Sequence, residues 1–212
     1  DVTAVYMGED SGATVYAASF VGDGSQLTGI TGSTSSLNDL TDVLVDSNSM
    51  FLGNPPTNST GGYNTASGRN SLNSNTTGDE NTASGYKALY NNTEGDENTA
   101  SGYKSLYENS TGSNNTASGR ESLYENTTGS NNTASGHKSL HYNTTGSYNT
   151  ASGLRSLYKN TTGIKNTASG MYSLYYNTEG NHNTASGYES LENNTTGNYN
   201  TASGYNSLQT NA

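Results

Sequence analysis

The sequence is poor in the residues that usually build a packed globular core. It has no Trp, only two Phe, and a hydrophobic fraction of 28% over 212 residues, whereas ordinary domains come close to half apolar. Charged residues make up only 12% of the chain, which is less than disordered chains usually carry. We therefore expect an ordered chain whose stability does not depend on one large core.

Other absences argue against whole classes of function. The chain contains no Cys, so it has no disulfide framework and no thiolate metal site. It has eight Lys and Arg against 18 Asp and Glu, a net charge of −10, which argues against binding to nucleic acid or to an anionic membrane. No apolar run is long enough for membrane insertion, and no signal peptide is recognisable. Because the chain begins with Asp1 rather than Met, we expect a processed form or a fragment.

The abundant residues form a repeat. The pentapeptide Asn-Thr-Ala-Ser-Gly recurs every 17 residues, beginning at Asn64, Asn81, Asn98, Asn115, Asn132, Asn149, Asn166, Asn183 and Asn200. The unit reads N-T-A-S-G-x-x-S-L-x-x-N-T-T-G-x-x, with eight full copies and a ninth truncated at Ala212. A fixed period without insertions indicates that every unit makes the same contacts with its neighbours.

The composition of the unit favours β structure. Asn, Thr, Ser and Gly are poor helix formers and good turn and ladder residues. Two Gly columns divide the unit and leave room for two short extended segments. We predict an all-β fold, a parallel β-solenoid (β-roll) of 17-residue coils stacked about 4.8 Å apart.

Two columns of the repeat predict the interior. The Ala column, predicted to be interior, runs from Ala66 to Ala202. The two Asn columns are predicted to lie at the corners and to stack their amides into hydrogen-bonded ladders. The Leu column, predicted to be interior, comprises Leu72, Leu89, Leu106, Leu123, Leu140, Leu157, Leu174, Leu191 and Leu208.

So thin a core predicts association between chains. One Leu and one Ala supply roughly 2–4 kcal/mol of burial per coil, whereas ordering the backbone costs on the order of 1 kcal/mol per residue. We therefore expect chains to pack side by side and to bury the Leu or Ala columns against one another. A homotrimer is the closed arrangement that we predict.

The period also divides the chain. Residues 64–212 form the solenoid of nine repeats, and residues 47–63, with Pro55 and Pro56, are interpreted as an irregular capping coil that protects the first ladder edge. Residues 1–46 are interpreted as an N-terminal fibre-type β segment or linker, with short strands expected over residues 2–7 and 13–21.

The unit resembles the head repeats of trimeric autotransporter adhesins and the similar repeats of phage tail fibres. The resemblance rests on the N-T-A-S-G core and the following S-L over residues 64–212, and residues 19–30 are similar to a linker motif of phage and bacterial fibre proteins. It implies a left-handed parallel β-roll, packing as a trimer, and a structural or adhesive fibre segment on a virion or outside a cell. The sequence departs from adhesin heads in its longer period and in Ser67, where those heads usually carry a bulkier aliphatic residue.

Tyrosines give the candidate binding surface. Exposed aromatic side chains with polar tips suit the recognition of a cell-surface glycan or a protein receptor. Alternatively, stacked Tyr side chains stiffen the solenoid or pack between chains. The candidate residues occupy two repeat positions and are Tyr86, Tyr90, Tyr103, Tyr107, Tyr124, Tyr158 and Tyr175.

Acidic residues give one candidate metal site. The period places Asp79 beside Asp96 and Glu80 beside Glu97, and four carboxylates so close together would repel unless a hard cation such as Ca²⁺ lay among them. The alternative is that they are solvated acids. We expect no other cofactor, and we interpret the three His residues as exposed substituents rather than ligands.

No arrangement of residues indicates catalysis, so we expect that the chain is not an enzyme. Two alternatives to the fibre stay open. The rows of Thr and Ser on either side of the Ala column, from Thr65 to Ser203, are typical of a solenoid face that orders water and binds ice. A self-assembling extracellular surface filament is the other.

Overall fold

A computed structural model describes residues 43–46, 49–52, 56 and 59–209. All of them belong to one compact unit, Ser35–Ala212. The strands expected over residues 2–7 and 13–21 and the linker-like motif at residues 19–30 lie outside the described residues. Within the described part of the chain, no helix has the length and apolar character needed to cross a membrane.

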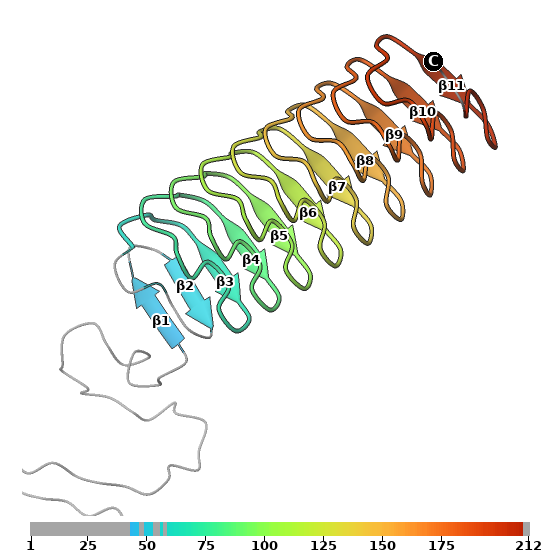
Figure 1. Cartoon of the computed structure of the whole chain (residues 1–212). Coiled ribbons are helices and arrows are strands. Elements are labelled where there is room, and N and C mark those ends of the chain that lie inside the picture. The colour runs from blue at the N-terminus through green and yellow to red at the C-terminus, as the bar shows by residue number, and fades with distance from the viewer. Residues whose placement is uncertain (1–42, 47–48, 53–55, 57–58, 210–212) are drawn as a thin grey trace, which may run out of the picture. The chain divides into compact units, whose positions relative to one another are not determined.

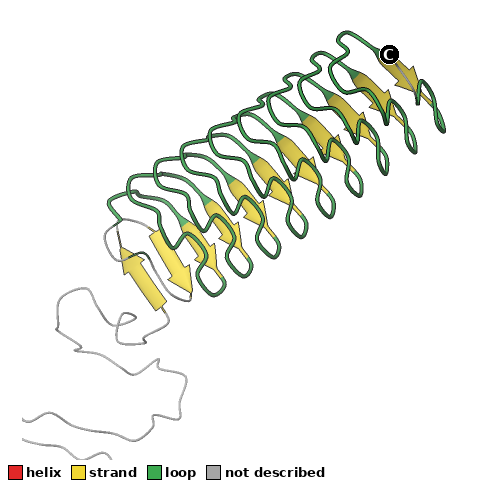
Figure 2. Ribbon diagram, in the orientation of Figure 1, coloured by secondary structure: helices red, strands yellow, loops and turns green. Residues whose placement is uncertain are grey.

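The described strands form a single sheet whose order follows the chain (Figures 1 and 2). β1 (Val43–Asp46) pairs antiparallel with β2 (Ser49–Leu52), and every later pair is parallel. The later strands are β3 (Thr65–Ser67), β4 (Thr82–Ser84), β5 (Thr99–Ser101), β6 (Thr116–Ser118), β7 (Thr133–Ser135), β8 (Thr150–Ser152), β9 (Thr167–Ser169), β10 (Thr184–Ser186) and β11 (Thr201–Ser203). Ala66 pairs with Ala83 and Ala83 with Ala100, so the register advances by one repeat per strand. The predicted parallel β-solenoid is confirmed.

Each coil contains one strand rather than the two extended segments that we expected. We number the coils 1 to 9 from residue 64, so coil 5 comprises residues 132–148. In that coil the chain leaves β7 and turns through Lys138, Leu140 and Tyr148, whose φ angles of 58°, 50° and 61° are left-handed. L-residues rarely adopt this conformation, so sequence patterns did not predict it. The rest of the coil is a chain of turns.

The Leu and Ala columns form the core inside each coil. Leu123 and Ala117 have no exposed surface, and no member of either column as far as Leu191 is more than 1% exposed. Leu208 is the exception at 51% exposed, because no described coil packs beyond it. A single chain thus covers both columns, and our expectation that partner chains would bury them was wrong.

Two Asn ladders run along the corners, as predicted. At one corner the Asn92 side-chain amide donates to Asn75 Oδ1 at 2.8 Å and to the Gly95 carbonyl at 2.9 Å. At the other, Asn64 Oδ1 accepts the Asn81 backbone N–H at 2.9 Å. These buried amides form hydrogen bonds with backbone N–H and C=O groups at the corners, which lie outside the strands and have no partner in the sheet.

The hairpin β1–β2 lies at the N-terminal end of the solenoid (Figure 1). Phe51 is buried and pairs with Ala66 of β3. The Ser49 hydroxyl accepts the Asn64 backbone N–H at 2.8 Å, taking the place of an Asn side chain in the ladder. β2 therefore covers the open edge of β3 with one strand of irregular sequence.

Candidate functional site

An aromatic column runs along the solenoid at the tenth position of coils 2 to 7. We define it by Tyr90, Tyr107, Tyr124, His141, Tyr158 and Tyr175. The rings of successive coils stack face to face, with centroids 5.0–5.4 Å apart. This spacing follows from the separation of neighbouring strands, so the coil geometry sets the stack.

Stacking limits what the aromatic column can bind. Tyr107 has Tyr90 on one face and Tyr124 on the other, each with an interplanar angle below 10°. Both ring faces of the interior members are therefore covered by protein, and only ring edges and hydroxyl groups remain for a ligand. Partial burial and a hydrogen bond with Tyr142 also raise the pKa of Tyr158 to about 12, so its hydroxyl stays protonated at neutral pH.

Tyr86 and Tyr103 lie apart from this column, at the sixth repeat position. Their rings stack at 5.4 Å, and they are 40% and 43% exposed. Of the seven Tyr residues predicted to bind a receptor, these two thus present the most open surface. The other five belong to the aromatic column.

Cations lie over the aromatic rings, an arrangement that we did not predict. Lys87 Nζ is 4.7 Å from the Tyr90 ring centroid, and Lys104 Nζ is 5.1 Å from that of Tyr107. At such distances the ring quadrupole attracts the charge. Both cations stand at the seventh repeat position, three residues before the aromatic column. Aligning the 17-residue units would have revealed this neighbourhood.

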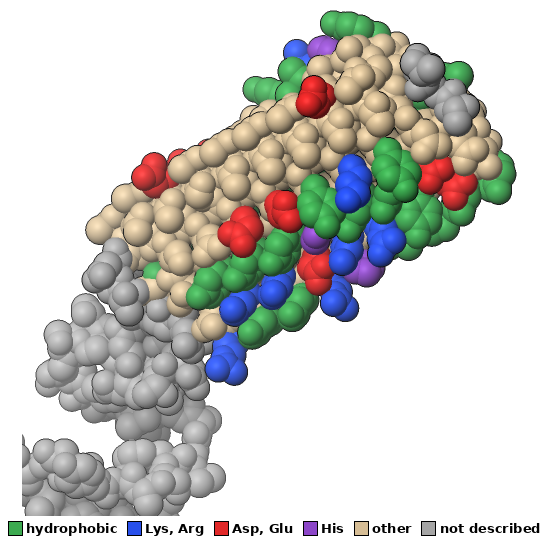
Figure 3. Space-filling model, in the orientation of Figure 1, with side chains coloured by type: hydrophobic (Ala, Val, Ile, Leu, Met, Phe, Trp, Pro, Cys, Tyr) green, Lys and Arg blue, Asp and Glu red, His purple; other side chains and the backbone are tan. Residues whose placement is uncertain are grey.

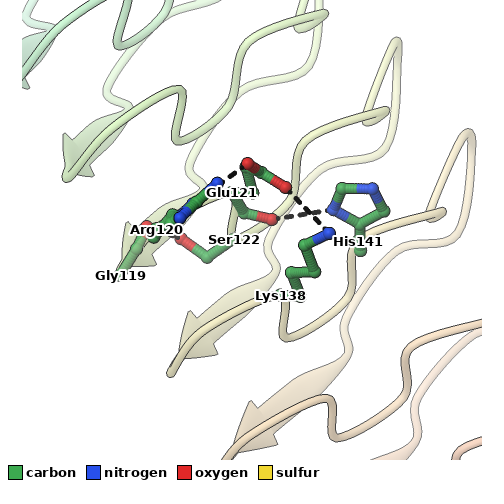
Figure 4. A network of polar contacts seen from close by, with 6 residues as sticks. All are labelled: Gly119, Arg120, Glu121, Ser122, Lys138 and His141. Carbon is green, nitrogen blue, oxygen red and sulfur yellow. Dashed lines mark hydrogen bonds and ion pairs between the residues drawn. The ribbon is translucent and has the colours of Figure 1, made fainter.

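Glu121 forms a small charged cluster among these cations (Figure 4). Its carboxylate accepts hydrogen bonds from Arg120 Nε and from Lys138 Nζ, each at 3.1 Å. Its backbone carbonyl oxygen lies 3.1 Å from His141 Nδ1. Partial burial acts to raise the pKa of Glu121, but the hydrogen bonds from Lys138 and Arg120 outweigh it and lower that pKa. Glu121 is therefore ionised at neutral pH.

Of the four predicted calcium ligands, the two Asp side chains accept hydrogen bonds from the backbone. Asp79 Oδ1 accepts the Gly62 backbone N–H at 2.7 Å, and Asp96 Oδ1 accepts that of Asp79 at 2.9 Å. In the next coil the Ser113 hydroxyl accepts the backbone N–H of Asp96. Asp, Ser and Asn side chains can all accept this hydrogen bond, which explains why all three occur at this repeat position. Among the described residues, no three His, Cys, Asp or Glu side chains are placed to hold a metal ion. The calcium site stays a prediction.

The Thr and Ser rows form a second regular surface. In every strand from β3 to β11 the Thr and Ser side chains are exposed and the Ala between them is buried. Parallel pairing aligns Thr116 with Thr133 and Ser118 with Ser135. The face is thus an uncharged array of hydroxyl groups in register.

No family model, curated protein or solved structure matches the chain.

Proposed function

We propose that this chain is a rigid segment of a surface fibre, such as a tail fibre or an adhesin, located on a virion or outside a cell. One observation carries the proposal: neighbouring coils are joined at every turn by the same backbone bonds. In coil 4, for example, Leu123 N–H donates to the Ser139 carbonyl and Thr127 N–H to the Thr144 carbonyl. Such a stack spaces whatever lies at its ends and displays identical surfaces at fixed intervals.

The role is mechanical and requires no catalytic group. Asn, Thr and Gly ladders replace a wide core, so the rod gains length without adding hydrophobic residues. The homotrimer is part of the proposal. The Thr and Ser face suits the contact between chains, because its small uncharged side chains allow close approach.

Whole-coil deletion tests the spacer role. Removing residues 115–131 joins two coils in register, so the rod should shorten by about 4.8 Å and still unfold cooperatively. Small-angle scattering measures the length, and light scattering on the same samples should give the mass of three chains.

The matched control removes residues 115–122, which leaves nine residues that cannot close a coil. We expect this variant to lose much of its stability. Unfolding of the whole-coil variant, or an unchanged rod length, would contradict the spacer role, and the mass of one chain would contradict the trimer.

Ice binding is a second candidate, supported by the Thr and Ser face. Its hydroxyl groups repeat in two directions, along the strands and across them, over nine strands. A regular hydroxyl array of this kind can order a layer of water.

A thermal hysteresis assay decides this candidate. If the face binds ice, the Thr116→Lys and Thr133→Lys pair should abolish hysteresis, because both side chains project from the middle of the array. Thr128→Lys should leave hysteresis intact, because Thr128 is exposed but lies outside the strands. Absence of hysteresis in the unmodified chain at high concentration eliminates the candidate.

A further inference from the structure

Six of the chain's eight cationic side chains line one side of the solenoid. They occupy the sixth or seventh repeat position of six successive coils, one in each. We define this basic stripe by Arg69, Lys87, Lys104, Arg120, Lys138 and Arg155. At about 4.8 Å per coil it is roughly 24 Å long. Figure 3 shows Lys and Arg side chains gathered with aromatic side chains along one side of the rod.

Aromatic rings contact four of the six cations of the stripe. Besides the contacts of Lys87 and Lys104, Arg120 lies 5.4 Å from the Tyr103 ring centroid and Arg155 lies 5.5 Å from that of Tyr158. The rings attract these cations without neutralising them, so the positive charge stays available to an anion. A preordered side chain also loses less conformational entropy when it binds.

Acidic groups near the stripe are few. Glu121 is the one acid at these positions in coils 1 to 6, and it is paired with Arg120 and Lys138. Glu108 and Glu125 follow the aromatic column in coils 3 and 4, on its other side in the repeat. The stripe therefore carries six positive charges and one negative charge in a chain of net charge −10.

We infer that the basic stripe and the aromatic column together bind a linear acidic glycan that lies along the rod. A straight row with one cation per coil fits a polymer that repeats its carboxylate or sulfate groups at a similar interval. The Tyr members of the column other than the buried Tyr158 are partly exposed, so their hydroxyl groups suit hydrogen bonds to sugar hydroxyl groups. The inference rests on the proposed fibre role, for which it names the surface and the ligand class.

Single-stranded nucleic acid is the competing polyanion, and the geometry disfavours it. Proteins that bind single strands without sequence preference stack the bases on open aromatic faces. Here the interior rings of the aromatic column cover one another at about 5 Å.

Binding to defined polymers tests the inference. We expect the intact chain to bind heparin and polygalacturonate at low salt, to release both as salt rises, and to leave neutral dextran unbound. Lys87→Gln with Lys104→Gln should weaken heparin binding at least tenfold. Lys165→Gln removes a cation that belongs neither to the stripe nor to the aromatic column and should change heparin binding less than twofold. Glu121→Gln removes the one acid of the stripe and should strengthen binding severalfold.

Circular dichroism and small-angle scattering on each variant separate this inference from the fibre role. A loss of heparin binding in Lys165→Gln as large as that in Lys87→Gln with Lys104→Gln, or heparin binding that survives Lys87→Gln with Lys104→Gln, would contradict the role of the stripe. Binding of oligothymidylate as tight as that of heparin would overturn the choice of a glycan. If either result were obtained while the rod length stayed unchanged, the glycan inference would be wrong but the proposed fibre role would not be contradicted.

Discussion

At the scale of single residues, His141 occupies a position that Tyr fills in neighbouring coils. Its ring stacks between Tyr124 and Tyr158, 5.1 Å and 5.4 Å away between centroids. It is buried, so our expectation that it would be an exposed substituent was wrong. Burial lowers the pKa of His141, and Lys138 and His137 act in the same direction. The backbone carbonyl and the carboxylate of Glu121 oppose them and are outweighed. The folded state therefore favours the neutral imidazole.

This shift predicts a loss of stability in acid. A His whose pKa is lower in the folded state stabilises the fold above its unfolded pKa of about 6.5, and that contribution is lost as pH falls below it. His141→Tyr should remove this part of the pH dependence and make the aromatic column uniform. Thermal melts at pH 7.5 and pH 5 measure the difference.

His137→Tyr is the control for this experiment, because position 137 is exposed and Tyr fills the equivalent position in coils 2 and 3. It should keep most of the acid sensitivity of the unmodified chain, because burial, the largest cause of the lowered pKa of His141, is unchanged and His137 is only a minor cause. An equal drop in melting temperature for His141→Tyr and the unmodified chain would contradict the interpretation of His141.

At the scale of the coil, the repeat predicted which side chains are buried but not the path of the backbone. Identical residues stacked every 17 positions must share an environment, so the Leu, Ala and Asn columns could be assigned from sequence. The turns could not, because Leu140 and Lys138 adopt φ angles of 50° and 58°, where Gly or Asn would be expected. The neighbouring coils enforce this conformation through bonds such as that from Leu140 N–H to the Ser156 carbonyl.

The Asn ladder predicts the cost of breaking one coil contact. Asn126 donates to Asn109 Oδ1 at 2.7 Å and to the Gly129 carbonyl at 2.9 Å, and it accepts from Asn143 at 2.8 Å. Asn126→Ala leaves buried polar partners unpaired and should lower the free energy of unfolding by about 3 kcal/mol. Guanidinium denaturation measures this change. Thr128→Ala, at an exposed position of the same coil, should cost less than about 0.5 kcal/mol.

At the scale of the whole molecule, net charge conceals how the charges are arranged. Residues 64–212 hold all eight Lys and Arg and 11 of the 18 Asp and Glu, a balance of 8 − 11 = −3. The remaining seven acids, and so most of the net charge of −10, belong to residues 1–63. A partner that meets the side of the solenoid meets a surface far less acidic than the average.

The fold also explains why the basic stripe could not be predicted from any single column. Its cations are divided between two adjacent repeat positions, with Arg69 and Arg120 at the sixth and the other four at the seventh, so neither column looks uniformly basic. Aligning the units shows both positions close to the aromatic column in the repeat, and closing the coil brings the cations over aromatic rings. The same closure buries Leu and Ala within one chain, so a trimer would have to form through an outer face. The Thr and Ser face suits that contact, because using it would leave the stripe open to a ligand.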